Sequence, residues 1–63
     1  MTRFGRYRGI RVEIVPAPRG DVSLFTDEPR ATEEGFVPYG FERPEIQQWV
    51  KNVAPDDPEL RRD

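Results

Sequence analysis

The sequence predicts a small α+β fold, in which a β-hairpin is packed by one amphipathic α-helix and the connections are irregular segments rich in proline and glycine. Residues 10–15 alternate between apolar and polar side chains, which is the period of a half-buried strand. In residues 44–53 the apolar side chains instead recur at helical spacing. With 63 residues the chain is long enough for one domain at most, so the hairpin and the helix must share a core.

The hairpin is predicted from two short strands and the turn between them. The strands span about residues 9–15 and 21–26, and the segment 16–20 contains two prolines and a glycine, which end a strand and favour a turn. The side chains expected on the apolar face of the hairpin are Ile10, Val12, Ile14, Val22 and Leu24. Because an isolated hairpin is only marginally stable in water, a further element must cover this face.

The helix is predicted over residues 44–53. Pro44 suits the first helical position, Glu45 suits the positive end of the helix dipole, and Pro55 ends the helix. The apolar stripe of this helix consists of Ile46, Trp49, Val50 and Val53. A helix of about ten residues is marginal by itself, so we expect the stripe to pack on the hairpin and to complete a core within residues 10–53.

The remaining segments have weaker signals. Residues 1–9 are expected to form a basic arm or an irregular edge segment, and residues 27–34 either a short helical turn beginning near Pro29 or a solvated loop. Residues 35–44 combine aromatic side chains with proline and glycine, which favours an extended crossover. The charged tail, residues 54–63, is expected to form a turn of helix or to fray. The alternative architecture is an extended chain that becomes ordered on a larger assembly.

Composition argues against catalysis. The chain contains no cysteine and no histidine, so it has no thiolate nucleophile, no imidazole base and neither of the soft ligands of a zinc site. Its paired acidic residues match no calcium-loop pattern. A chain of this length cannot readily enclose a pocket as well as a core. The sequence therefore predicts a protein that is not an enzyme and that uses no cofactor and no metal.

The sequence indicates neither a secretion signal nor a membrane-spanning segment. The basic N-terminal residues are followed by no apolar run, and no apolar stretch approaches the ~20 residues of a transmembrane helix. We therefore expect a cytoplasmic protein with no membrane partner. Small domains without disulfides or metals often rely on assembly, so docking on a larger partner is expected, with homo-oligomerisation as an alternative.

Charge and aromatic side chains provide the candidate binding residues. The net charge is −2, yet residues 1–19 carry five arginines against one glutamate, whereas residues 20–63 carry five basic and eleven acidic side chains. Aromatic rings alternate with guanidinium groups near the N-terminus and gather again in residues 36–41. The candidate contact residues are Arg3, Phe4, Arg6, Tyr7, Arg8, Arg11, Phe36, Tyr39 and Phe41.

These residues predict a small accessory or interaction protein, such as a subunit, an adaptor or an inhibitor, that binds a larger protein or assembly. Aromatic and arginine side chains carry much of the energy of protein interfaces. The alternative is a nucleic-acid-binding protein, in which the stretch Arg3–Arg11 binds phosphates and stacks on bases. A third interpretation pairs the arginines with the acidic half of the same chain.

Overall fold

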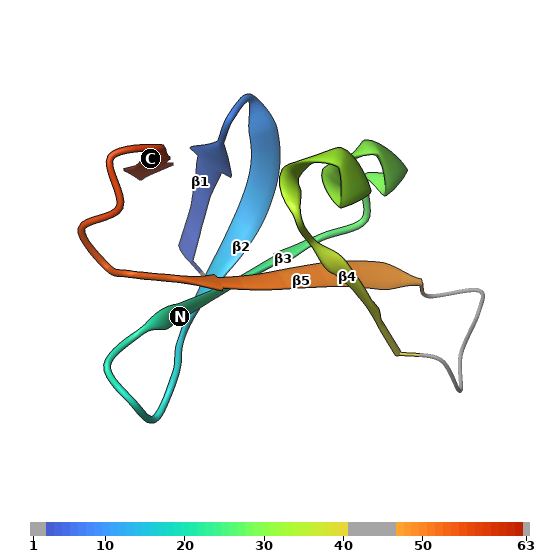
Figure 1. Ribbon diagram of the computed structural model, residues 1–63. Coiled ribbons are helices and arrows are strands. Elements are labelled where there is room, and N and C mark those ends of the chain that lie inside the picture. The colour runs from blue at the N-terminus through green and yellow to red at the C-terminus, as the bar shows by residue number, and fades with distance from the viewer. Residues whose placement is uncertain (1–2, 41–46, 63) are drawn as a thin grey trace.

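The fold is an antiparallel β-sheet with one short 3₁₀ helix. The computed structural model describes residues 3–40 and 47–62. Within these ranges the sheet has six strands in the order β4-β5-β3-β2-β1-β6, and neighbouring strands pair in antiparallel fashion (Figure 1). In chain order the elements are β1 (Arg3–Tyr7), β2 (Ile10–Pro16), β3 (Val22–Thr26), η1 (Pro29–Glu34), β4 (Val37–Tyr39), β5 (Gln48–Val53) and β6 (Leu60–Arg62).

The predicted α+β class is wrong, because the described part of the chain contains no helix of seven or more residues and is mostly antiparallel sheet. The segment predicted as a helix, residues 44–53, instead provides β5, which lies between β3 and β4 in the sheet. The first residues of that segment, 44–46, lie outside the described residues. In Figure 1, β5 runs across the molecule, and β1 and β2 stand steeply to it.

The change from helix to strand in β5 has a physical reason. A short apolar run cannot be assigned by periodicity alone, and Trp49, Val50 and Val53 are residue types with high strand propensity. As a strand, β5 pairs through Trp49–Val53 with all five residues of β3 and so satisfies backbone groups on the open side of the predicted hairpin. Both faces of β5 are partly covered, which is why its burial shows no simple alternation.

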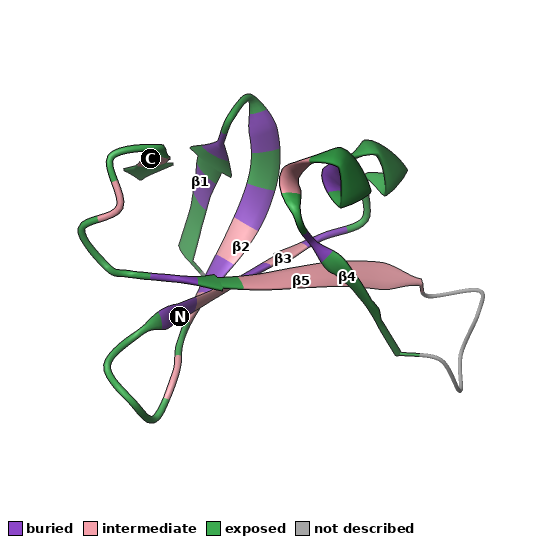
Figure 2. Cartoon of the chain, in the orientation of Figure 1, coloured by how far each residue is buried: buried purple, intermediate pink, exposed green. Residues whose placement is uncertain are grey.

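The predicted hairpin is confirmed. β2 and β3 pair in antiparallel register, with Ile14 opposite Leu24. Buried residues alternate with more exposed ones along β2, as Figure 2 shows. The turn is closed by hydrogen bonds from the Ala17 amide to the Asp21 carbonyl oxygen and from the Gly20 amide to the Ala17 carbonyl oxygen. Gly20 adopts a φ of 88°, a backbone conformation that favours glycine.

The N-terminal segment forms an internal strand. β1 lies between β2 and β6, so residues 3–7 do not form the predicted basic arm or irregular edge segment. β1 and β2 are joined by Arg8 and Gly9, whose φ angles of 52° and 81° match a two-residue type I′ turn. The tail likewise ends in β6, paired with β1, rather than in a turn of helix. The first and the last described segments, β1 and β6, are therefore both part of the sheet.

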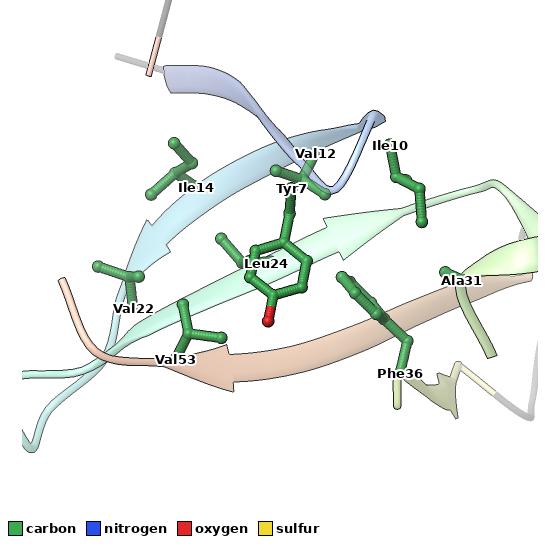
Figure 3. Packing of buried hydrophobic residues seen from close by; sticks show 9 residues of the cluster. All are labelled: Tyr7, Ile10, Val12, Ile14, Val22, Leu24, Ala31, Phe36 and Val53. Carbon is green, nitrogen blue, oxygen red and sulfur yellow. The ribbon is translucent and has the colours of Figure 1, made fainter. Parts of the chain in front are cut away.

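The core lies on one face of the curved sheet, which we call the inner face, and η1 closes its end. The buried apolar side chains are Tyr7, Ile10, Val12, Ile14, Val22, Leu24, Ala31, Phe36 and Val53 (Figure 3). The rings of Tyr7 and Phe36 meet edge to face, with their centroids 5.9 Å apart. Leu24 has no solvent exposure and lies within this cluster.

Most of the predicted core is confirmed. The predicted residues that are buried are Ile10, Val12, Ile14, Val22, Leu24 and Val53. Trp49 is partly buried and packs against the cluster, whereas Val50 is half-buried on the opposite face of the sheet. Ile46 lies outside the described residues. Three further side chains, Tyr7, Ala31 and Phe36, complete the core.

The short helix η1 lies against the turn between β1 and β2. The helical alternative for residues 27–34 is confirmed, with Pro29 at the start of the helix and Gly35 at a φ of 88° after its end. Arg30 Nη2 donates a hydrogen bond of 3.2 Å to the Gly9 carbonyl oxygen. This contact holds η1 over the end of the sheet at which Tyr7 and Ile10 are buried.

Lys51 ties the other end of η1 to β5. Its Nζ donates a 2.8 Å hydrogen bond to the Glu34 carbonyl oxygen and lies 5.2 Å from the centroid of the Tyr7 ring. Replacing Lys51 with alanine is expected to lower the free energy of unfolding by about 1–3 kcal/mol, because a charged hydrogen-bond donor and a cation–π contact are lost together. Urea unfolding followed by Trp49 fluorescence measures this loss.

The control for Lys51 is Arg19, an exposed cation in the turn between β2 and β3. Arg19→Ala should change the free energy of unfolding by less than about 0.5 kcal/mol. Equal effects of the Lys51 and Arg19 substitutions would show that the bond to η1 contributes nothing to stability.

Candidate functional site

The candidate site is the face of the sheet opposite the core, which we call the outer face. Residues paired across neighbouring antiparallel strands have their side chains on the same face. The strand register therefore places one row of outer-face side chains across β4, β5, β3, β2 and β1. This central row consists of Val37, Val50, Phe25, Glu13 and Phe4. Its two rings flank β2, so Phe4 and Phe25 lie two strand spacings, about 10 Å, apart.

The aromatic side chains of the outer face are open to solvent. Phe4 is 39% exposed, and Tyr39, at the end of β4, is 53% exposed. Tyr39 contacts Phe25 edge to face, with the ring centroids 5.4 Å apart. Large exposed rings that gather on one surface are typical of an interaction site.

A second row on the outer face carries positive charge. Arg6 lies directly opposite Arg11 on β2 and directly opposite Arg61 on β6. We call these three residues the arginine row. All three are exposed, and none forms an ion pair with another described residue. The Arg11 guanidinium lies over the ring of Phe4, 4.7 Å from its centroid, so the arginine row touches the central row.

The arginine row is electrostatically unfavourable in the free protein. Like charges directly opposite each other on neighbouring strands destabilise a sheet. The strands lie about 4.8 Å apart, so three guanidinium groups follow one another from β2 to β6. The outer face is therefore expected to attract an anionic group that reduces this repulsion.

A depression of about 250 Å³ lies beside the two rows on the outer face. The residues that line it include Phe4, Arg11, Glu13, Phe25, Asp27 and Gln48. The lining thus combines two rings with a guanidinium, two carboxylates and an amide. Such a site can hold a planar group by stacking and can exchange hydrogen bonds with the polar edge of that group.

The structure divides the predicted contact residues into several groups. Those that lie together on the outer face are Phe4, Arg6, Arg11 and Tyr39. Tyr7 and Phe36 lie in the core in contact with each other. Arg3 lies opposite Ile14, away from the outer face. Phe41 lies outside the described residues.

Arg8 is engaged within the chain. Its Nη1 donates a 3.1 Å hydrogen bond to Glu34 Oε2, and its Nε lies 4.0 Å from Glu59 Oε2. The hydrogen bond to Glu34, together with the charge of that carboxylate, raises the pKa of the Arg8 guanidinium above its ordinary value. One interpretation of the sequence pairs the arginines with the acidic half of the same chain. Arg8 forms such pairs, whereas the arginine row forms none among the described residues.

The candidate contact residues predicted from the sequence do not include Phe25, Glu13 and Arg61, which lie on this face. The signal for Phe25 is present in the sequence, because an aromatic side chain falls on the otherwise polar side of residues 21–26. No local signal marks Arg61. Its place beside Arg6 depends on the pairing of β6 with β1, which joins the two ends of the chain.

Within residues 3–40 and 47–62, no group of three acidic side chains is arranged to hold a metal ion. Among the described elements, no helix has the length and apolar character needed to cross a membrane. Comparison with protein-family models, with curated proteins and with solved structures found no match. The outer face is therefore interpreted from its own geometry and charge.

Proposed function

We propose that this chain is a small non-catalytic interaction protein that binds a larger macromolecular partner through the outer face of its sheet. The observation that carries this proposal is the contact between the exposed Phe4 ring of the central row and Arg11 of the arginine row. Adjacent aromatic and arginine side chains are enriched in the residues that dominate binding energy at interfaces.

The proposal keeps the accessory role expected from the sequence, such as a subunit, an adaptor or an inhibitor, and assigns it a different surface. In place of a flexible arm and a separate aromatic turn, a single face presents Phe4, Arg6 and Arg11 from β1 and β2 together with Tyr39 from β4. A cytoplasmic location and homo-oligomerisation stay predictions from the sequence.

Chemical considerations support binding rather than catalysis at this face. The chain has no histidine and no cysteine. Carboxylates that act as general acid or base work best when desolvated in a pocket. Asp27 is exposed, and Glu13 is only half-buried in a depression that opens to solvent.

A double substitution, Phe4→Ala with Tyr39→Ala, tests the face. Both side chains are exposed, so the variant should fold, which Trp49 fluorescence and a thermal melt can verify. The partner is first captured from the native host with the tagged wild-type chain and is then purified. We expect the double variant to bind this purified partner at least tenfold more weakly, a loss of about 1.4 kcal/mol. The matched control, Arg19→Ala with Glu33→Ala, removes two exposed side chains outside the central and arginine rows and should bind normally.

Two results would contradict the proposal. The first is a folded double variant that binds the purified partner as tightly as the wild-type chain does. The second is an equal loss of affinity in the control variant, which would place the contact on another surface.

A further inference from the structure

We propose that the partner of the outer face is single-stranded nucleic acid, with bases stacked on the exposed rings and phosphates bound by the arginine row. The inference rests on the proposed function and names the chemistry of the partner. Three features of the outer face support it: the charge of the arginine row, the exposed rings of Phe4 on β1 and Tyr39 on β4, and the polar lining of the depression.

The arginine row offers phosphate sites at a regular spacing. Arg11, Arg6 and Arg61 lie on consecutive strands, so an extended anionic chain that crosses β2, β1 and β6 meets a guanidinium about every 5 Å. Each guanidinium can bind a phosphate through paired N–H donors. Bound phosphates would also reduce the repulsion among the three arginines.

Two arginines elsewhere in the described chain, Arg8 and Arg30, lie close to carboxylates. Arg8 is paired with Glu34, and Arg30 lies 3.8 Å from Glu28. The chain as a whole has more acidic than basic residues, so acidic side chains are available to neutralise arginines. The arginine row, like Arg3, Arg19 and Arg62, has no ion pair among the described residues. What sets the row apart is that its three unpaired guanidinium groups lie on consecutive strands, where they can bind one external anion together.

The Phe4 ring provides a stacking surface next to this charge, and Tyr39 provides a second one on the far edge strand, β4. Phe4 and Tyr39 are exposed on the outer face, and the Arg11 guanidinium already lies over the Phe4 ring. Bases stack on aromatic rings and on guanidinium planes alike, which is how sheets that bind single strands hold unpaired bases. Glu13 and Gln48, in the depression, can exchange hydrogen bonds with the amino and carbonyl groups of a base edge.

The middle of the outer face fits nucleobases better than it fits a protein surface. The centre of a protein interface is depleted in charged residues. Here the depression beside the rings is lined by Arg11, Glu13 and Asp27, whose charges an apolar protein side chain could not satisfy. A base offers hydrogen-bond donors and acceptors around its edge. A duplex would not suffice, because stacking hides the faces of its bases and pairing hides their Watson–Crick edges.

Fluorescence anisotropy with labelled DNA and RNA oligonucleotides of mixed sequence, about 12 nucleotides long, tests the inference at low salt. The wild-type chain is expected to bind the single strands. The logarithm of its association constant should fall by about 2 for each tenfold rise in salt, since each of three phosphate contacts contributes roughly 0.7. The duplex of the same sequence should bind about tenfold more weakly or worse, because it offers phosphates without free bases.

Substitutions separate the two kinds of contact. Phe4→Ala should weaken binding by about 5-fold to 150-fold, the range for one lost stacking contact. Arg6→Ala should weaken binding and lower the salt slope by about 0.7. The matched Arg19→Ala variant removes an exposed arginine from outside the arginine row and should leave both quantities unchanged. The fold of each variant is checked by Trp49 fluorescence.

The inference is overturned if the folded wild-type chain binds none of the single strands, if it binds the duplex equally well, or if Arg6→Ala and Arg19→Ala have the same effect. In each of these cases the proposed function still depends on how the Phe4 and Tyr39 double variant binds a purified partner protein. A purified partner protein that the Phe4 and Tyr39 double variant no longer binds would assign the outer face to an acidic protein surface. A partner protein that the double variant still binds would refute the proposed function as well.

Discussion

Replacing Leu24 with alanine is expected to lower the free energy of unfolding by about 2–5 kcal/mol, the range for a leucine removed from a packed core. Leu24 is fully buried, with Ile14 opposite it on β2 and Lys51 opposite it on β5. A chain of 63 residues has a total stability of only about 3–9 kcal/mol. The substitution should therefore unfold a substantial part of the protein at room temperature.

Urea unfolding followed by Trp49 fluorescence measures this loss. Val15→Ala is the matched control, because Val15 is an aliphatic side chain of the same sheet that is half-buried on the outer face. It should cost less than about 1 kcal/mol, since fewer methyl groups lose their packing. If the two substitutions cost the same, Leu24 does not lie in the core and the inner and outer faces are assigned wrongly.

The hairpin of β2 and β3 could be predicted from the sequence because its signal is local. Alternation along residues 10–15 decides which side chains face the core, and the prolines and glycine of residues 16–20 decide where the chain turns. The burial of Val12, Ile14 and Leu24 follows from these two facts without knowledge of the rest of the fold.

β5 and β1 could not be predicted, because their structures depend on contacts remote in the sequence. The spacing of Trp49, Val50 and Val53 is compatible with a helix and with a strand, and the open side of β3 favours the strand. In β1 the inner face is formed by Gly5 and Tyr7, whereas an apolar ring, Phe4, points outward. This arrangement conceals the alternation on which strand prediction relies.

The candidate site shows the same limit. The sequence points to aromatic and arginine side chains as candidates, but it does not show which of them share a face. Phe4 and Tyr7 are three residues apart, so in a strand they lie on opposite faces, one exposed and one in the core. In a flexible arm the two rings would have been equivalent, which is why both were candidates.

Replacing Gly5 with alanine is expected to lower the free energy of unfolding by about 1–3 kcal/mol. In most strands the same substitution has the opposite effect and stabilises the protein by about 0.5–1 kcal/mol. A Cβ atom at Gly5 would collide with the Arg61 carbonyl oxygen of β6 and would lie 3.0 Å from Ile14 Cδ1. Because the first of these contacts is with backbone, no side-chain rotation can relieve it. We expect β6 to move away from β1.

A double-mutant cycle with Leu60 tests this displacement. Leu60 lies on β6 and packs against the core, so Leu60→Ala should cost less stability in the Gly5→Ala background than in the wild-type chain. Gly9→Asn is the control, because a Cβ at Gly9 meets open space and asparagine tolerates the positive φ there. Additive costs of the Gly5 and Leu60 substitutions would show that β6 stays in place.

The same substitution connects the core to the outer face. Arg61 lies opposite Arg6 only while β6 is paired with β1. Gly5→Ala should therefore weaken single-strand binding at least as much as Arg61→Ala does, and adding Arg61→Ala to it should have no further effect on affinity. If Arg61→Ala still weakens binding in the Gly5→Ala background, the arginine row does not depend on the close approach of β6 to β1. If it does not, Gly5 is required for binding although it is buried and has no side chain to contact a partner. Its role is then to let β6 approach β1, which sets the position of the Arg61 charge on the outer face.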